Sequence, residues 1–416
     1  MSGDFKREWW FFLRDRQSVA TVVAGFLMAT LAVGLGLRDV VLQQEEITSL
    51  QSSTLEDLKS TLADQPDAGS AAYYGFRFVY DPPSELAFAA QCVRDQLPWK
   101  HRIRMLALEG QIYEHDSGNP ELAQSGRIDY AFLVSVLAPL LIILMLHDLV
   151  DHERRGNRLD LLAATAGNVG RPLFWRAFVR LSALATGLVL PFIAAAVWSD
   201  AAMAPVVLLA VATTAYVMFW GIAVTWVAHR APTAATAATI LLGAWVTLTL
   251  AVPLTAAAIA ERSIAVPQGG EILLNQREVV NRAWDLPEED TMVAFVATHP
   301  EWTDYTETGD GFEWKWYYAF QQVGDQSVDE SSRALREGVR ARDEFMAGAA
   351  LLSPPLLIDR LFTRAANTDV AAFQRYEACA RNYHEYLRKA HYPMVFGAEA
   401  FDVSRLLALD NVKACS

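Results

Sequence analysis

The sequence lacks the motifs that identify several common catalytic and metal-binding sites. It contains no GxxxxGK motif followed by Ser or Thr, no HExxH motif, no CxxC pair and no GxSxG motif. The first of these forms the phosphate-binding loop of many ATPases, so the chain does not hydrolyse ATP by that mechanism on its own. His147, Asp148, Asp151 and His152 carry groups that bind metals, but at a membrane surface such residues are more often solvated or paired. We expect no catalytic residue, no metal site and no cofactor in this chain.

Basic residues are also scarce. The chain has 35 Lys and Arg against 48 Asp and Glu, which gives a net charge of -13 at pH 7. A protein that binds nucleic acid needs a basic face for the phosphates, and an acidic balance does not suggest one. We therefore exclude nucleic acid as a partner class.

What the sequence does contain is long apolar runs. Hydrophobic residues make up 53% of the chain and its mean hydropathy is +0.16, yet 20% of the residues are charged. Five runs are long enough to cross a bilayer as helices. They cover roughly residues 19–37, 128–148, 177–198, 205–228 and 233–259. The composition predicts a mainly α, polytopic membrane helix bundle with soluble segments attached to it.

The distribution of Lys and Arg between these runs predicts the orientation. Four precede the first run, six lie between Val150 and Arg180, and Arg230 lies in the connection after the fourth run. Loops rich in Lys and Arg remain in the cytoplasm. The N-terminus is therefore expected in the cytoplasm, and both long hydrophilic segments are expected in the periplasm, at the inner membrane of a bacterium.

These features divide the chain into seven segments. In order they are a cytoplasmic interfacial helix at 1–18, span 1 at 19–37, periplasmic domain 1 at 38–127, span 2 at 128–148, a cytoplasmic loop at 149–176, spans 3 to 5 at 177–261 and periplasmic domain 2 at 262–416. Trp9, Trp10, Phe11 and Phe12 lie between basic residues, which is typical of an anchor at the lipid headgroups. A cleaved signal peptide is the alternative for this end, but no obvious small-residue cleavage site follows the first run.

The two periplasmic segments differ in pattern. Segment 38–127 begins with apolar residues at helical spacing, which prolong span 1 outwards, and a short alternating stretch then predicts a strand before Pro82. It is expected to be a small α+β cap. Segment 262–416 predicts a larger, mostly helical domain with a break at Pro354 and Pro355. Its aromatic cluster is more typical of a core than of a ligand-stacking surface, and consists of Trp302, Trp314, Trp316, Tyr317 and Tyr318.

Cysteine is rare, with three residues in the chain, Cys92, Cys379 and Cys415. All three fall in segments expected in the periplasm, an oxidising compartment in which disulfides persist. Cys379 and Cys415 are a possible pair, but their spacing alone does not decide whether they are bonded.

Two motifs resemble those of ABC-2 type transporter permease subunits with large periplasmic insertions, the NosY-like permeases. The first motif begins before span 2 and runs through it into the following loop. Its matching residues are Asn119, Pro120, Leu122, Gly126, Asp129, Pro139, Leu140, Leu141, Glu153, Arg154, Gly156, Leu159, Leu161 and Leu162. In the second motif Asn367, Thr368 and Asp369 stand in place of a GTD-like triplet. The chain departs from the family at Asn157, where a Gly-Thr-Leu step is usual.

The resemblance implies a transport subunit that is not itself an enzyme. ATP and Mg would bind a separate cytoplasmic ABC ATPase, a second permease copy or a paralogue would complete the membrane part, and segment 1–18 would be the elbow helix. The loop would seat on the ATPase through Glu153, Arg154, Arg155, Arg158, Leu159, Leu161, Leu162 and Arg171. The resemblance also implies a sixth, C-terminal membrane helix, which these 416 residues do not contain.

The residues alone leave two alternatives open. The arginines of loop 149–176 also fit the excess of cytoplasmic positive charge, and on that interpretation they contact lipid phosphates only. The whole chain would then suit a polytopic membrane receptor or scaffold whose periplasmic domains bind a partner. Neither the substrate nor the direction of transport follows from the sequence.

Overall fold

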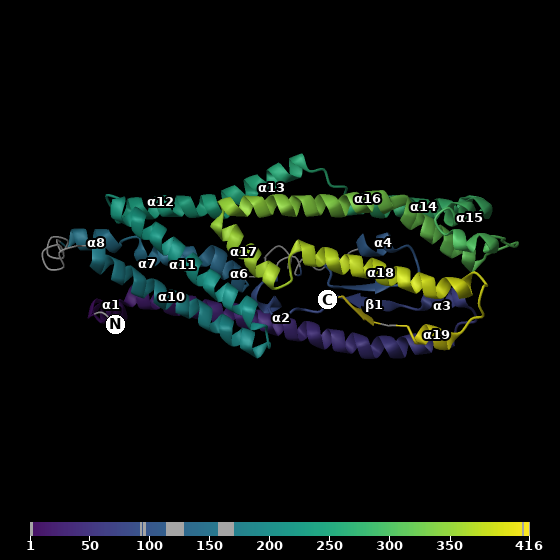
Figure 1. Ribbon diagram of the computed structural model, residues 1–416, viewed down its shortest axis with the longest axis horizontal. Helices are drawn as coiled ribbons and strands as arrows, with labels where there is room; N and C mark the ends of the chain where they lie inside the picture. The colour runs from purple at the N-terminus through teal and green to yellow at the C-terminus, as the bar shows by residue number, and fades with distance from the viewer. Residues whose placement is uncertain are drawn as a thin grey trace.

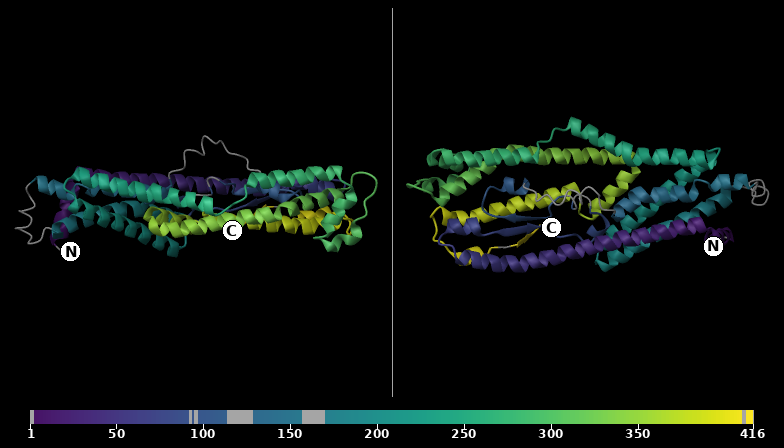
Figure 2. Two further views of the ribbon diagram at one scale, coloured as in Figure 1. Left: turned by 90° about the horizontal axis from the view of Figure 1, so that it is seen from above. Right: turned by 180° about the vertical axis from the view of Figure 1, so that it is seen from behind.

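The computed structural model describes residues 3–91, 94, 97–113, 129–156, 170–409 and 412–415. These residues form an elongated, mainly helical molecule with two parts (Figure 1). A bundle of long apolar helices lies at the end that holds the N-terminus, and a body built from the hydrophilic segments lies at the other end. The two further views in Figure 2 show the same division. We call the second part the outer body.

Within the described residues, five helices are long and apolar enough to cross a membrane. Two of them contain a π-helical turn. In order they are α2 (Arg16–Ala63); α6 (Tyr130–Phe132) with η3 (Leu133–Leu137), α7 (Ala138–Leu146) and α8 (Leu149–Arg155); α10 (Gly170–Trp198); α11 (Met203–Arg230); and α12 (Ala234–Val246) with η4 (Thr247–Ala251) and α13 (Val252–Ser263). The prediction of a mainly α fold with five membrane-length helices is confirmed.

A separate short helix, α1 (Gly3–Arg14), precedes the first long helix. The chain turns at Asp15, whose carboxylate accepts hydrogen bonds from the backbone N–H of Gln17 and from the hydroxyl of Ser18. An Asp side chain in this position satisfies donors that the first turn of a helix leaves unpaired. The cap at Asp15 therefore ends α1 and starts α2 in a new direction.

The aromatic residues of α1 do not all face outwards. Trp9, Trp10 and Phe11 are exposed, whereas Phe12 is buried. Successive side chains on a helix point in different directions, so four consecutive aromatic residues do not share one face. Phe12 is buried within the chain, and the anchor at the lipid headgroups stays a prediction for the exposed Trp9, Trp10 and Phe11.

A small sheet in the outer body contains strands from both hydrophilic segments of the chain. In the described part of the chain, β1 (Arg77–Tyr80), β2 (Lys100–Ile103) and β3 (Val412–Ala414) form a sheet in the order β2-β1-β3. β1 pairs antiparallel with β2 and parallel with β3. The strand expected before Pro82 is confirmed, and one of its neighbours comes from the far end of the chain. A disulfide between Cys379 and Cys415 fixes β3 to α18 (Val370–Val395).

The two hydrophilic segments therefore make one body. Val79 and Ile103 from the first segment share a core with Phe295, Tyr318 and Tyr376 from the second, and all five side chains are buried. This differs from the sequence-based division into a small cap and a separate helical domain. The shared core could not be predicted from the sequence, because neither a strand of three residues nor contacts between distant segments produce a periodic pattern.

The remaining described elements outside the five long helices are helical. They are α3 (Ala68–Tyr74), η1 (Ala87–Ala89), α4 (Leu108–Tyr113), α14 (Gly269–Arg282), η5 (Ala283–Asp285), α15 (Glu288–Val296), η6 (Pro300–Tyr305), α16 (Trp314–Ala349), η7 (Ala350–Leu352), α17 (Pro354–Ala365) and α19 (Val403–Leu407). The break expected at Pro354 is confirmed, because α17 begins there and Ser353 caps it. The aromatic cluster is part of the core as expected, since Trp316 and Tyr318 are buried and Trp302 and Tyr317 pack against buried residues.

Helix α17 leaves the outer body and packs against the outer ends of the long helices. The ring of Phe362 is fully buried and lies edge-on to Tyr130 at 5.5 Å and to Phe192 at 5.9 Å between centroids. The hydroxyl of Ser353 donates a hydrogen bond of 2.6 Å to the carbonyl of Leu248 in η4. The sequence predicts a helix here, but nothing in its pattern indicates that the helix returns to the bundle.

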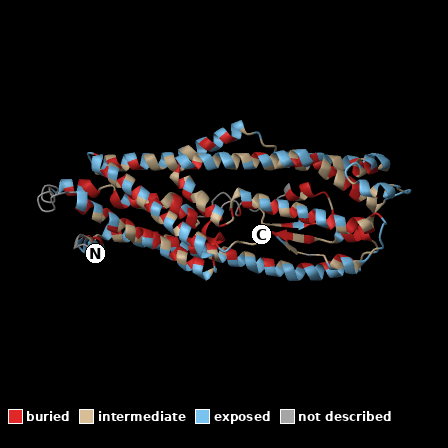
Figure 3. Ribbon diagram, in the orientation of Figure 1, coloured by how far each residue is buried: buried red, intermediate tan, exposed pale blue. Residues whose placement is uncertain are grey.

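Figure 3 shows that the long helices are unevenly buried. α6, α7 and α10 contribute many buried residues, whereas in α12 and η4, at the edge of the bundle, Ala237 and Leu241 alone are buried. Large apolar side chains such as Ile240, Leu242 and Leu250 are exposed there. Lipid or another apolar helix is the natural cover for such a face.

Candidate coupling site

A buried ion network lies at the end of the bundle farthest from the outer body. The guanidinium of Arg176 on α10 donates to Glu153 of α8 at 2.6 Å and to Glu8 of α1 at 3.1 Å. Both carboxylates are buried, with Glu8 2% and Glu153 6% exposed. Glu8 also pairs with Arg7 of its own helix at 3.2 Å, so Arg176 is the cation that bridges the two buried carboxylates and not the sole partner of Glu8. Arg176 therefore joins three helices.

A second pair reinforces this corner. Arg180, one turn further along α10, donates to the Asp15 carboxylate at 2.7 Å and to the carbonyl of Met145 at 2.9 Å. Burial of Asp15 opposes ionisation, but the hydrogen bond from Ser18 and the charge of Arg180 outweigh it and lower the pKa of the Asp15 carboxyl. The capped turn between α1 and α2 is thus held to α10 and to the end of α7.

Helix α8 also holds the turn between α11 and α12. The Asp151 carboxylate accepts a hydrogen bond of 3.0 Å from the backbone N–H of Ala234, and Arg154 donates to the carbonyls of Ala231 and Pro232 at 3.2 and 2.8 Å. α8 is therefore bonded to α10, to α1 through Arg176, and to the turn before α12. A displacement of α8 would move these elements together.

The structure divides the residues that the resemblance assigns to ATPase contact. Glu153 is buried in the ion network, whereas Arg154, Arg155 and Arg171 are exposed at the same end of the bundle. The other four assigned residues lie outside the described residues, namely Arg158, Leu159, Leu161 and Leu162. Glu153 connects helices within this chain, and the assignment of these residues to ATPase contact stays a prediction.

Sequence reasoning did not find Glu8, Asp15, Arg176 and Arg180 as a set. Each is a charged residue at the edge of an apolar run, where the positive-inside rule already gives a reason for the arginines. The carboxylates were the sequence feature that could have indicated the network, because an acidic residue beside a long apolar helix needs a cation from another segment. That requirement indicates that partners exist but not which ones they are.

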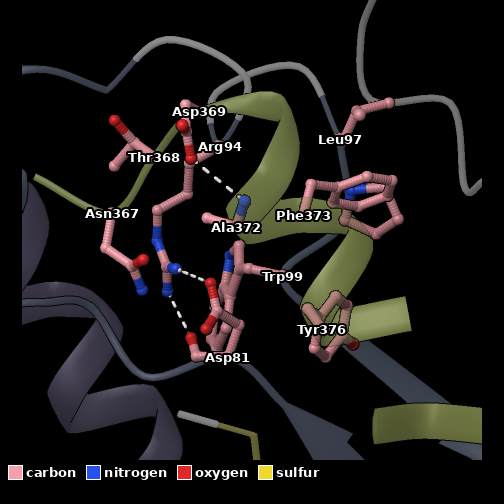
Figure 4. Close-up of a pocket in the computed structure, with 11 residues that line it drawn as sticks. Asp81, Arg94, Leu97, Trp99, Asn367, Thr368, Asp369, Ala372, Phe373 and Tyr376 are labelled. Atoms are coloured by element: carbon pink, nitrogen blue, oxygen red, sulfur yellow. Dashed lines mark hydrogen bonds and ion pairs between the residues drawn. The ribbon is translucent and has the colours of Figure 1, made fainter. Parts of the chain in front are cut away.

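The triplet Asn367–Asp369 of the second motif forms a joint in the outer body (Figure 4). The Asp369 carboxylate caps α18 through the N–H of Ala372 at 3.0 Å, and the Thr368 hydroxyl donates to the carbonyl of Ala90 at 2.9 Å. Beside them Arg94 pairs with Asp81. The enclosed space is about 10 Å³, roughly the volume needed for one water molecule. This motif therefore ties α18 to the first hydrophilic segment.

No cluster of three or more His, Cys, Asp or Glu suited to a metal ion occurs among the residues that the structure describes. His147, Asp148, Asp151 and His152 do not form one, and Asp151 is engaged by Arg155 at 2.6 Å and by the turn before α12.

Comparison with known proteins gives one match. A family model described as a domain of unknown function, DUF3526, matches residues 270–410, which begin in α14 and end after α19. Neither the curated proteins nor the solved structures include a match. The matched region includes α17 and the Asn367–Asp369 joint, but it does not reach α2, α6–α8, α10 or the ion network.

Proposed function

We propose that this chain is the membrane subunit of an ABC-2 type transporter, in which a separate cytoplasmic ATPase binds ATP and Mg. The observation that carries the proposal is the buried network of Glu8, Glu153 and Arg176. It joins α1, α8 and α10 at the place where the resemblance expects the loop that contacts the ATPase. A loop that moves with a partner can displace a bundle only if it is rigidly bonded to it, and this network supplies such bonds.

Two structural routes connect this end of the bundle with the outer body. α10 packs against α2, which continues without a break into the outer body. On the other side, α17 rests on the outer ends of α6 and α11 and leads into α18. We infer that movement of α8 is passed along both routes, so that ATP-driven closure rearranges the outer body relative to the bundle.

The proposal includes an orientation. The N-terminus lies in the cytoplasm of the bacterial cell, the bundle crosses the inner membrane, and the outer body lies in the periplasm. The excess of Lys and Arg at the α1 and α8 end supports this. The disulfide between Cys379 and Cys415 also supports it, since disulfides persist in an oxidising compartment.

The proposal also includes a second permease chain, either another copy or a paralogue. Thr239, Gly243 and Thr247 follow one another at four-residue spacing on the exposed side of α12 and η4. Apart from the adjoining backbone of its own helix, no atom of the described structure lies within 4 Å of the position that a side chain would take at Gly243. Small residues in such a row permit close approach of a second membrane helix.

The ATPase contact can be tested by reversing one charge in the loop. We expect Arg158→Glu to abolish co-purification of the ATPase with the tagged chain from its native cells, and with it the ATPase activity of the purified complex. A charge reversal opposes a charged contact and is therefore expected to weaken one. The matched control is Arg333→Glu on α16, an equal reversal at an exposed residue of the outer body.

Two outcomes would contradict the proposal. One is a wild-type chain that co-purifies with no ATPase. The other is an Arg158→Glu variant that retains as much ATPase activity as the Arg333→Glu control. The first result would favour the alternative of a membrane receptor or scaffold, and the second would favour the interpretation in which the loop arginines contact lipid phosphates only.

A further inference from the structure

The outer body contains an open cavity that the proposed coupling does not use. It measures about 790 Å³ and lies between α4, η6, α16 and α18. Cavities that bind small molecules or short peptide segments commonly measure roughly 300 to 1,000 Å³. The cavity belongs to the part of the molecule farthest from the ion network of α1, α8 and α10 (Figure 1).

Carboxylates already engage the basic residues that line this cavity. Arg388 pairs with Asp325 at 2.8 Å, and Arg381 pairs with Glu109 at 2.7 Å, both at the buried floor. Lys389 pairs with Glu385 at the rim. Arg388 and Arg381 hold α18 to α16 and α4, and the charge of all three cations is largely cancelled within the protein. They therefore offer little net attraction to an anionic ligand.

The remaining charge of the site is negative. Five acidic and three basic residues line the cavity. Glu301 lies exposed at its rim and has no ion-pair partner among the described residues. The segment that contributes Glu301, residues 283–314, contains nine Asp or Glu and no Lys or Arg. Burial lowers the pKa of His299 and of His384, so these two lining residues add no positive charge near pH 7.

The walls of the cavity can contact the apolar part of a ligand as well as its charged group. Trp302 and Tyr392 line it, with ring centroids 6.3 Å apart and planes nearly perpendicular. The aliphatic stems of Lys and Arg pack well against aromatic rings, and their charged ends are attracted to the ring faces. Arg388, which is 8% exposed, has an Nε without a hydrogen-bond partner in the described structure. A ligand carbonyl oxygen is the type of group that such a donor lacks.

We infer that this cavity binds a basic peptide segment, with a Lys or Arg side chain beside Glu301 and Trp302 and the peptide backbone toward Arg388. A peptide combines the three features that the cavity matches, namely a cation, an apolar stem and carbonyl acceptors. In the proposed orientation the segment would come from a periplasmic protein or peptide, but the binding itself does not depend on contact with an ATPase.

The test uses the full chain in detergent without nucleotide and a labelled probe. The probe is a fluorescein-labelled pentapeptide amide of sequence Leu-Lys-Leu-Arg-Leu, with an analogue that carries Glu in both basic positions. We expect fluorescence anisotropy to show saturable binding of the basic peptide only. Glu301→Lys should weaken this binding about tenfold or more, because it places a cation where the peptide cation binds, and Glu301→Gln should weaken it less.

The matched control is Glu330→Lys, an equal reversal at an exposed residue on α16 that does not line the cavity. We expect this variant to bind the basic peptide within about twofold of wild type, since an exposed charge outside the contact is screened by salt. Equal weakening by Glu301→Lys and Glu330→Lys would overturn the inference, because the loss of peptide binding would then follow from the net charge of the protein and not from the position of Glu301. Equal binding of the acidic analogue, or no binding of the basic peptide, would overturn it as well.

Discussion

Arg176 illustrates what a single residue does in the ion network. Its guanidinium is the shared partner of Glu8 and Glu153, which lie 145 positions apart in the sequence (153 minus 8). The sequence predicts that such a residue lies near the cytoplasmic face, but several arginines satisfy the same rule. Its role as the link between three helices follows only from where the helices pack. For this reason the loop was predictable from sequence and the network behind it was not.

Glycine provides another residue-scale feature in α2. A Cβ on Gly36 would lie 2.0 Å from the carbonyl oxygen of Phe88 in η1, which is a backbone atom that cannot move aside independently. Two residues earlier on the same helix, a Cβ on Gly34 would meet no atom within 4 Å. Gly36 therefore permits the close approach of α2 and η1, whereas Gly34 faces open space.

The first stability prediction compares these two positions. Gly36→Ala should lower the stability of the chain by about 1–3 kcal/mol, since an added methyl group in a packed contact forces the backbone to shift. Gly34→Ala should be neutral or stabilising by up to about 1 kcal/mol, because Ala favours the helical backbone more than Gly does. Thermal unfolding of the two variants in the same detergent measures the difference. Equal midpoints would contradict the assigned contact between α2 and η1.

At the scale of elements, α17 was predicted as a helix but not as a part of the bundle. Its start follows from Ser353 and Pro354, a capping residue and a proline at the first helical position. Its amphipathic pattern indicates a buried face without saying which surface covers it. The covering residues come from α6, α10, α11 and η4, and no local pattern relates those helices to α17.

The second stability prediction concerns this contact. Phe362→Ala should cost about 3–5 kcal/mol, because the ring is fully buried between Tyr130 and Phe192 and its removal leaves a cavity. Leu357→Ala on the same helix should cost less than about 1 kcal/mol, since Leu357 is exposed. Thermal unfolding provides the comparison. A Phe362→Ala variant as stable as Leu357→Ala would mean that α17 does not dock on the bundle.

At the scale of the whole molecule, the long apolar helices and the local breaks were predictable from the sequence. The contacts between segments that lie far apart in the chain were not. The five long helices follow from run length alone, and the continuation of span 1 outwards follows from the helical spacing after it. The single outer body depends on β3, a strand of three residues, and on the Cys379–Cys415 bond. Neither feature produces a periodic pattern in the sequence. For this reason the sequence predicts two separate domains.

The orientation of the whole molecule gives the last prediction. In a Cys92→Ser background, with Cys379 and Cys415 in their disulfide, we expect Gly309→Cys to react with an impermeant maleimide on intact cells. Gly156→Cys should react only after permeabilisation, because it lies exposed beside α8 at the other end of the molecule. Both glycines lie on the surface, so accessibility of the side chain does not limit either reaction. The reverse labelling pattern would refute the orientation.

The unbroken course of α2 makes this helix a lever arm. Its 48 residues extend about 72 Å at a rise of roughly 1.5 Å per residue. If α10 tilts the lower part of such a rod by about 10°, the upper end sweeps through roughly 12 Å, provided that no hinge absorbs the rotation. Gly34 and Gly36 are the sites where a hinge would be expected in this rod, and the carbonyl of Phe88 braces the helix at the second of them. In the proposed orientation, this brace would let a small rotation at the N-terminal end of the helix produce a displacement of about that size at the far end.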